Sequence, residues 1–231
     1  MLSVVSMNDR SEINYADSYF ENIIKVHAPI NRRVKETIDV YILSCIEGEK
    51  DDLTMWRLYG EDSRGACIVY SIDMDLINNS EFILAPISYA DKNQKHRELD
   101  LVYDMMTRDF KKSQEKAKLK FVFKRWDIWK HFFKPYDYHD EKEVRLLYKC
   151  NRETNDKKWI LSNLNIFTPL VEFAGYNNEE KKGRLPLKIE KILLGPNSPE
   201  RSLNIDILMK LMKEYQIPIS IEQSTIDNYR L

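Results

Sequence analysis

Long apolar runs are absent from this sequence, and cysteine is scarce. A membrane-spanning helix needs about 20 consecutive apolar residues, and residues 1–7 lack both the basic start and the apolar length of a signal peptide. We therefore expect no membrane role. The three cysteines, Cys45, Cys67 and Cys150, are an odd number and lie far apart. This pattern indicates reduced, buried thiols in a cytoplasmic protein instead of a disulfide framework.

An excess of charge of either sign is also missing. Lys and Arg number 36 and Asp and Glu 37, so the formal net charge is −1. Such a balance produces no global field that would steer the molecule toward nucleic acid or anionic lipid. The lysines between residues 111 and 120 alternate with acids and aliphatic residues, as on an ordinary solvated helix. A nucleic-acid partner is therefore not indicated.

Motifs for metal binding and covalent catalysis are not found. His27, His96 and His131 have no partner at the spacing of a zinc site, so no metal cofactor is expected. The cysteines lie in apolar stretches where a thiol pKa rises, and none is predicted to be a nucleophile. The turn at residues 195–199 matches neither a P-loop nor a dinucleotide-binding fingerprint, and helix capping explains it better.

Apolar material is plentiful: 43% of the 231 residues are hydrophobic and 11% are aromatic. This is enough for one sizeable core, so we expect a single domain over residues 1–231. The fold predicted is α+β, with a mixed or antiparallel central sheet flanked by helices. Strands are expected at residues 40–46, 66–72, 142–149, 189–194 and 217–223. Helices are expected before Pro29, at residues 53–59, twice within a helical insertion at about 92–134, and from Pro199 to Tyr215.

The tightest acidic cluster lies around the predicted strand at residues 142–149. Glu141 and Glu143 share one face if the strand begins early, with Arg145 next on that face. Two close carboxylates raise each other's proton affinity and can act as acid and base or stabilise a developing cation. The alternative is a solvated strand face on which Arg145 is a local counter-ion.

A second candidate lies on the short helix at residues 53–59. Trp56, Arg57 and Tyr59 lie between two predicted core strands, where an aromatic ring and a cation could reach a ligand. Trp56 can equally anchor the core, as most aromatic residues at such spacing do. Arg57 is the more informative test of a binding role.

The order of the motifs resembles the domain-of-unknown-function 2971 family. The motifs that carry this resemblance are Met7-Asn-Asp-Arg-Ser-Glu12, Leu53-Thr-Met-Trp-Arg-Leu-Tyr59 with Gly65-Ala-Cys-Ile-Val-Tyr70, Asp140-Glu-Lys-Glu-Val-Arg145, Leu194-Gly-Pro-Asn197, and Ser224 before Tyr229-Arg230. They span almost the whole chain. Members usually begin with a strand that carries a His-Tyr-Thr-like motif, and the printed sequence has no such stretch.

In outline that family is similar to the ADP-ribosyltransferase fold, in which a late glutamate lies beside NAD. The resemblance implies that Glu143 stabilises the oxocarbenium-like cation formed as nicotinamide leaves, and that Glu141 orients substrate. It implies a bacterial toxin or phage-defence enzyme with NAD as co-substrate. The further residues implied are Trp56 or Tyr59 to stack on a ring, Arg57, Arg145 or Arg230 to meet phosphates, and Asn8 and Asp9 to line the cleft, with helix capping an equal alternative for Asp9.

Two other functions stay open from the sequence. The missing His strand favours a non-catalytic nucleotide- or partner-binding module. A weaker alternative is a metal-dependent phosphoesterase or nuclease that uses Asp137, Asp140, Glu141 and Glu143. The target of any modification and the oligomeric state are not readable from the chain.

Overall fold

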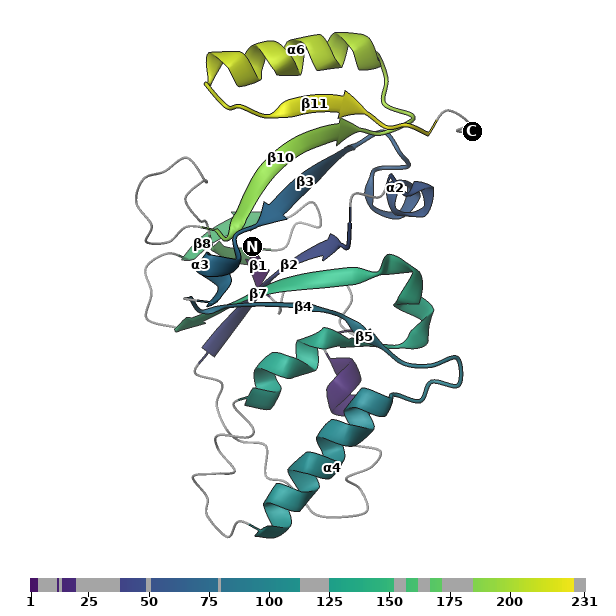
Figure 1. The fold of residues 1–231 in the computed structure, drawn as a ribbon, viewed down its shortest axis with the longest axis vertical. Coiled ribbons are helices and arrows are strands. Elements are labelled where there is room, and N and C mark those ends of the chain that lie inside the picture. Colours follow the sequence, from purple (N-terminus) through teal and green to yellow (C-terminus); the bar gives the residue numbers. More distant parts are fainter. Residues whose placement is uncertain are drawn as a thin grey trace. The chain divides into compact units, whose positions relative to one another are not determined.

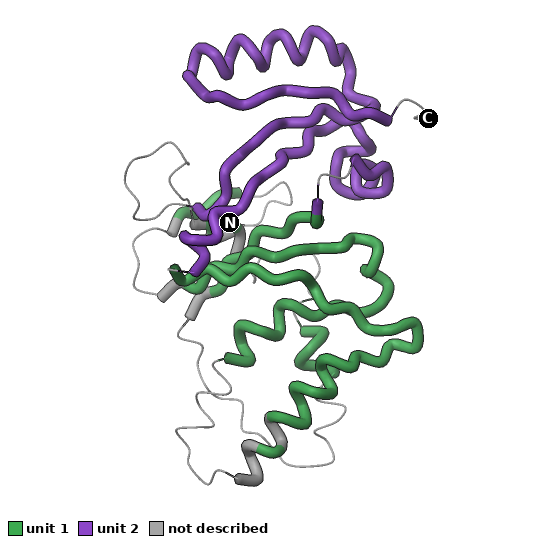
Figure 2. The backbone as a smooth tube through the Cα atoms, in the orientation of Figure 1, with its two compact units in different colours: residues 1–47, 80–172 green, residues 48–79, 173–231 purple. Residues whose placement is uncertain are grey.

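The computed structural model describes residues 1–3, 12, 14–19, 38–48, 51–78, 80–112, 125–151, 157–161, 167–171 and 185–226. The chain divides into two compact units, residues 1–47 with 80–172 and residues 48–79 with 173–231 (Figure 2). The structure combines helices with antiparallel and mixed sheets, so the predicted α+β class is confirmed. The expectation of one domain stays a prediction.

Unit 1 is built on a six-stranded sheet in the order β4-β7-β2-β1-β9-β8, with antiparallel neighbours (Figure 1). Its strands are β1 (Leu2–Ser3), β2 (Ile38–Ile46), β4 (Phe82–Pro86), β7 (Glu143–Asn151), β8 (Lys157–Leu161) and β9 (Phe167–Val171). The sequence predicted β2 and most of β7, but not the shorter strands. Those strands carry too few residues for a period-2 pattern to stand out.

The centre of this sheet is the pair β2 and β7. Ile42 of β2 lies opposite Leu147 of β7, and both belong to a buried cluster with Ile87, Ile128 and Phe132. Aliphatic side chains that alternate along each strand supply one apolar face for this cluster. Burial of that face fixes the register, because a shift by one residue would expose it.

The predicted helical insertion is partly confirmed. Helix α4 (Arg97–Lys112) and a helical stretch at residues 125–129 are present, and the 3-10 helix η2 (Lys130–Phe132) follows. The second predicted helix is wrong at its end, because Phe133–Lys134 forms strand β6, which pairs in parallel with β5 (Ser88–Tyr89). This two-residue ribbon positions the site described below. Residues 113–124 lie outside the described part.

Unit 2 contains a three-stranded sheet in the order β11-β10-β3. The central strand β10 (Leu187–Leu194) pairs antiparallel with β3 (Ala66–Ile72) and parallel with β11 (Ser220–Gln223). The helices are α2 (Leu53–Tyr59), α3 (Met74–Asn78) and α6 (Arg201–Glu214). Helix α2 has the predicted bounds, and its N-cap Asp52 accepts hydrogen bonds from the Thr54 and Met55 N–H groups.

A strained turn joins α2 to β3. Glu61, Asp62 and Ser63 all have left-handed backbone angles, with φ of 51°, 52° and 66°. Each such non-glycine residue costs about 1–2 kcal/mol. The turn is held by the Gly195 loop, because the Ser63 carbonyl accepts from the Asn197 N–H at 2.9 Å and the Gly65 carbonyl accepts from the Gly195 N–H at 2.9 Å. A β-carbon at position 195 would lie 2.2 Å from the Ser63 carbonyl oxygen.

No helix within the described ranges is long and apolar enough to cross a membrane.

We predict that Gly195→Ala lowers the free energy of unfolding by about 3 kcal/mol, because two stretches of backbone would have to separate. The matched control is Gly48→Ala. Gly48 has φ of +80° but no atom within 4 Å of the added β-carbon, so only about 1 kcal/mol should be lost. Urea unfolding of the full chain measures both. Equal losses would contradict the close approach.

Candidate functional site

The candidate site begins on strand β7. Glu143, Arg145 and Leu147 alternate along one face of this strand, and Leu147 lies in the core cluster. The two charged residues continue that buried face, since Glu143 is 5% exposed and Arg145 is 2% exposed. Glu143 and Arg145 share this face, as the sequence predicted. The alternative of a solvated strand face is wrong, because both charged side chains are buried.

The turn before β7 brings a second glutamate to the same place. Residues Tyr136–Glu141 form the 3-10 helix η3, and Lys142 then adopts a left-handed conformation with φ of 45°. The expectation that Glu141 lies on the strand is therefore wrong. The reversal at Lys142 nevertheless directs Glu141 and Glu143 to one ammonium group, that of Lys134. A left-handed lysine is unusual and marks a place where the surrounding structure determines the backbone.

The geometry of η3 gives it three distinct faces, because side chains three residues apart eclipse in a 3-10 helix. Tyr136 and His139 stack, with ring centroids 4.1 Å apart. Tyr138 and Glu141 both lie against Lys134, whose ammonium nitrogen is 5.0 Å from the Tyr138 ring centroid. The third face, which carries Asp140, is exposed.

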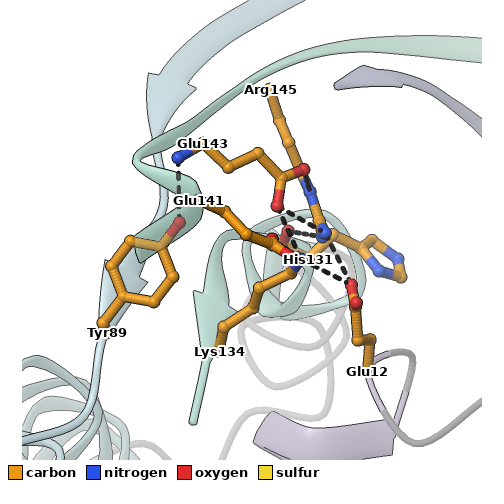
Figure 3. A network of polar contacts seen from close by, with 7 residues as sticks. All are labelled: Glu12, Tyr89, His131, Lys134, Glu141, Glu143 and Arg145. Carbon is orange, nitrogen blue, oxygen red and sulfur yellow. Dashed lines mark hydrogen bonds and ion pairs between the residues drawn. The ribbon is translucent and has the colours of Figure 1, made fainter. Parts of the chain in front are cut away.

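The two-residue ribbon of β5 and β6 supplies the other wall of the site. Adjacent strand residues point to opposite sides, so Phe133 packs in an aromatic cluster while Lys134 enters the charge cluster. On β5, Tyr89 lies beside Lys134 in the register, and its hydroxyl accepts a hydrogen bond from the Glu143 N–H at 2.9 Å. This hydrogen bond fixes the backbone of Glu143 independently of its side-chain contacts (Figure 3).

Arg145 holds Glu143 with a bidentate contact. Its Nε donates to Glu143 Oε1 at 2.5 Å and its Nη2 to Glu143 Oε2 at 3.1 Å (Figure 3). Nη2 also donates to Glu12 Oε2 at 2.8 Å, and Nη1 donates to the His131 carbonyl at 2.6 Å. Planar, bidentate geometry of this kind is the strongest form of charge-assisted hydrogen bond between side chains.

Lys134 joins three carboxylates. Its ammonium nitrogen lies 2.6 Å from Glu141 Oε2, 2.7 Å from Glu143 Oε2 and 3.1 Å from Glu12 Oε2. Burial alone would lower the pKa of Lys134, but its hydrogen bonds to Glu141 and Glu143 raise that pKa above the ordinary value. The lysine therefore stays charged. We name Glu12, Lys134, Glu141, Glu143 and Arg145 the charge cluster.

Glu143 is an anion throughout the physiological pH range. Burial would raise its pKa, but hydrogen bonds from Arg145 and Lys134 hold the pKa below the usual value. The group is thus suited to stabilising positive charge and not to donating a proton. Across the described cluster, three carboxylates and two cations give a formal sum of −1.

His131 lies beside the cluster as a neutral ring. Burial is the main cause that lowers the pKa of His131 to about 3, and the positive charges of Lys130 and Arg145 lower it further. The group is uncharged at neutral pH and adds no positive charge to the cluster. Its backbone carbonyl is the part that contacts Arg145.

The opposite side of the ribbon is aromatic. His96 is fully buried, its Nε2 lies 3.0 Å from the Ser88 carbonyl oxygen, and its ring is edge-on to Phe133 at 5.2 Å between centroids. A carbonyl only accepts, so the His96 Nε2 carries the proton. Tyr15, in the helical stretch at residues 14–19, has its ring centroid 6.2 Å from that of His96. These rings pack on the face of the β5–β6 ribbon opposite to the Lys134 side chain.

In unit 2, the Trp56 side chain is buried in the core. Its indole N–H donates to Asp51 Oδ1 at 2.6 Å, and the same carboxylate accepts from the Ser224 hydroxyl at 2.9 Å and from the Thr225 N–H. Burial would raise the pKa of Asp51, but the hydrogen bonds from Trp56, Thr225 and Ser224 hold it below the usual value. This placement agrees with the core-anchor alternative for Trp56. Arg57 and Tyr59 are exposed on α2.

The structure brings only some of the predicted site residues together. Glu141, Glu143 and Arg145 meet in unit 1, whereas Trp56, Arg57 and Tyr59 belong to unit 2. The remaining predicted residues, Asn8, Asp9 and Arg230, lie outside the described residues.

Sequence reasoning missed Lys134, His131, Tyr89 and the clustering role of Glu12. One signal for Lys134 was present, since it is a lone charge after Phe132-Phe133 and before Pro135. A charge within an apolar run must either interrupt the core or find a buried partner. Glu12 offered no such signal, because its capping pattern explained it locally.

Among the residues that the structure describes, no group of three or more His, Cys, Asp or Glu side chains is arranged to hold a metal ion. Neither Cys45 nor Cys67 forms a disulfide. Burial raises the pKa of the Cys67 thiol, and the charge of Asp51 raises it further, so Cys67 is a poor nucleophile at neutral pH.

Residues 55–146 match the family described as "Protein of unknown function (DUF2971)". This range begins within α2 and runs through η3 to the Glu143–Arg145 segment of β7, and over it the family resemblance is confirmed. The motifs at residues 7–12, 194–197 and 224–230 lie outside the matched range. No curated protein and no solved structure matches the chain significantly.

We predict that Arg145→Met lowers the free energy of unfolding by about 3–5 kcal/mol, because it leaves Glu143 buried without its main partner. Asp140→Asn is the control. It removes an exposed charge from the adjoining turn, where the Asp140 side chain is 76% exposed, and should cost less than about 0.5 kcal/mol. Denaturant unfolding measures both. A loss below about 1 kcal/mol for Arg145→Met would contradict the buried pairing.

A second prediction concerns acid stability. The ordinary pKa of His131 is 6.5, and the folded value is about 3. Between these values the unfolded chain binds a proton that the folded chain does not, so His131 makes stability fall as pH drops below 6.5. The expected contribution is about 1.4 kcal/mol per pH unit between pH 6 and pH 4.

His131→Gln should therefore flatten the dependence of unfolding free energy on pH by that slope, while keeping the backbone carbonyl that Arg145 contacts. His139→Gln changes a histidine that is 40% exposed and should leave the wild-type slope. Urea unfolding at half-unit pH steps measures the difference. Identical slopes for wild type and His131→Gln would contradict a buried neutral His131.

Proposed function

We propose that the charge cluster is the anionic centre of an NAD-using, ADP-ribosyltransferase-like enzyme. The observation that carries the proposal is the convergence of Glu141 and Glu143 on one ammonium group within a cluster whose described charges sum to −1. A centre of this charge favours a cationic group over a neutral one. The family resemblance of residues 55–146 is compatible with the proposal but assigns no chemistry.

The chemistry needs a carboxylate that stays ionised. When the bond between the ribose C1′ and the nicotinamide nitrogen breaks, the electron pair leaves with nicotinamide and positive charge develops on the ribose. A nucleophile of the acceptor then bonds to C1′ and loses its proton. A fixed anion stabilises the developing charge, a contribution of several kcal/mol in comparable sites. The lowered pKa of Glu143 keeps negative charge in this centre, beside Glu141.

The burial of the two glutamates suggests how they divide the work. Both oxygens of Glu143 are bonded to Arg145, and its side chain is 6% exposed. The Glu141 side chain is more exposed, at 12%. We therefore assign Glu141 to the substrate and Glu143 to holding Lys134 and Arg145 in place, whereas the resemblance implies that Glu143 stabilises the cation and Glu141 orients substrate.

The roles in meeting a nucleotide phosphate and base that the resemblance implies for Arg57 and Tyr59 of α2 stay predictions. Both are exposed. Trp56 is proposed only as the anchor of α2. The possible setting in toxin or phage-defence systems rests on the family resemblance alone.

Incubation of the full chain with labelled NAD and cell lysate tests the proposal. Glu141→Gln should reduce label transfer at least about 100-fold, because the developing cation loses its nearest anion. Asp140→Asn, one residue away and exposed, should transfer label as the wild type does. No transfer by the wild type, or equal transfer by Glu141→Gln, would overturn the transferase proposal.

A non-catalytic nucleotide-binding module is the second candidate. The observation in its favour is that Glu143 is already bonded on both oxygens, which is typical of a structural ion pair. This candidate predicts that NAD or another nucleotide raises the melting temperature without label transfer. Failure of both measurements would leave the cluster with a structural role alone.

A further inference from the structure

The Tyr89 hydroxyl adjoins the charge cluster and carries a proton that the cluster does not use. Its oxygen accepts a hydrogen bond from the Glu143 N–H at 2.9 Å. A phenol hydroxyl can also donate one hydrogen bond, and within the described part of the chain no group accepts that bond from Tyr89. Tyr89 is only half-buried. Its O–H group can therefore donate to a ligand without breaking a contact of the folded chain.

The position of this hydroxyl is fixed by the backbone of strand β5. The Glu143 carbonyl accepts from the Ile87 N–H at 2.8 Å, and the Lys134 carbonyl accepts from the Ala90 N–H at 3.1 Å. Tyr89 lies between these two anchors and beside Lys134 in the register of β5 and β6. Its side chain therefore extends on the Lys134 side of the ribbon (Figure 3). A donor held in this way loses little freedom when a ligand binds.

The surroundings of Tyr89 keep its hydroxyl protonated. Burial raises the pKa of Tyr89, and the negative charges of Glu143 and Glu141 also raise it, against the opposing effects of the Glu143 N–H hydrogen bond and of Lys134. The hydroxyl thus lies within electrostatic reach of Glu141. At neutral pH the two groups are complementary, because the phenol donates a hydrogen bond and the carboxylate only accepts.

We propose that Tyr89 donates a hydrogen bond to a ribose hydroxyl of the substrate while Glu141 accepts the proton of that hydroxyl, so that Tyr89 determines specificity for the sugar. A hydroxyl is both a donor and an acceptor, so it satisfies the phenol and the carboxylate together. A cation without a hydroxyl would satisfy the carboxylate alone and leave the Tyr89 O–H group without a partner. The inference rests on the proposed function and adds a sugar hydroxyl to the features that this centre recognises.

Calorimetric titration of the full chain with NAD, and with NAD analogues that lack the 2′- or the 3′-hydroxyl of the nicotinamide ribose, tests the inference. The wild type should bind NAD at least about tenfold more tightly than one of the two analogues, because the missing hydroxyl leaves both protein groups unpaired. Tyr89→Phe should lower that ratio of dissociation constants at least about threefold. A role confined to anchoring the Glu143 N–H would weaken all three ligands alike and leave the ratio unchanged.

Tyr136→Phe is the matched control. It removes a phenol oxygen from η3, where the Tyr136 ring stacks on His139, and should keep the wild-type ratio. An unchanged ratio in Tyr89→Phe would overturn the inference. Equal binding of NAD and both analogues by the wild type, or binding of none of them, would also overturn it, and these two results need no folded variant.

The same titrations separate this inference from the transferase proposal. A wild type that shows the expected ratio but transfers no label would remove the transferase and keep the sugar-recognition role of Tyr89. Label transfer together with an unchanged ratio in Tyr89→Phe would keep the transferase and remove that role.

Discussion

The bidentate contact between Arg145 and Glu143 is the interaction on which the rest of unit 1 depends. It places two opposite charges on the buried face of β7, next to the aliphatic core, where neither is stable alone. Arg145 then reaches Glu12 and the His131 carbonyl, and Glu143 reaches Lys134. The contact thus connects the central sheet to the helical segment that carries Glu12 and to the β5–β6 ribbon.

The ribbon shows how a very short element can organise two environments. Lys134 and Phe133 are neighbours in sequence, yet one enters the charge cluster and the other contacts the His96 ring. A rigid aromatic support behind Lys134 limits the positions of its ammonium group, and that group orients Glu141. Preorganised charge of this kind is what a centre for stabilising a cation requires, and it also serves a purely structural role.

The parts that sequence could predict were those with local patterns. The alternation from Val144 to Tyr148 indicated a strand, an aspartate at 51 or 52 and Gly60 indicated the limits of α2, and the spacing of Glu143 and Arg145 indicated a shared face. The rest depends on contacts between distant residues. Glu12 and Arg145 meet across 133 positions, and Ser224 and Asp51 across 173. The left-handed Lys142 carries no glycine or asparagine signal that would reveal it.

A double-mutant cycle tests most directly whether the Glu143–Arg145 pair holds the cluster together. The unfolding free energies of wild type, Glu143→Gln, Arg145→Met and the double variant give the coupling between the two side chains. A buried bidentate pair predicts a coupling of about 2 kcal/mol or more, since either single change already removes the interaction. Additive losses, with coupling near zero, would contradict the account.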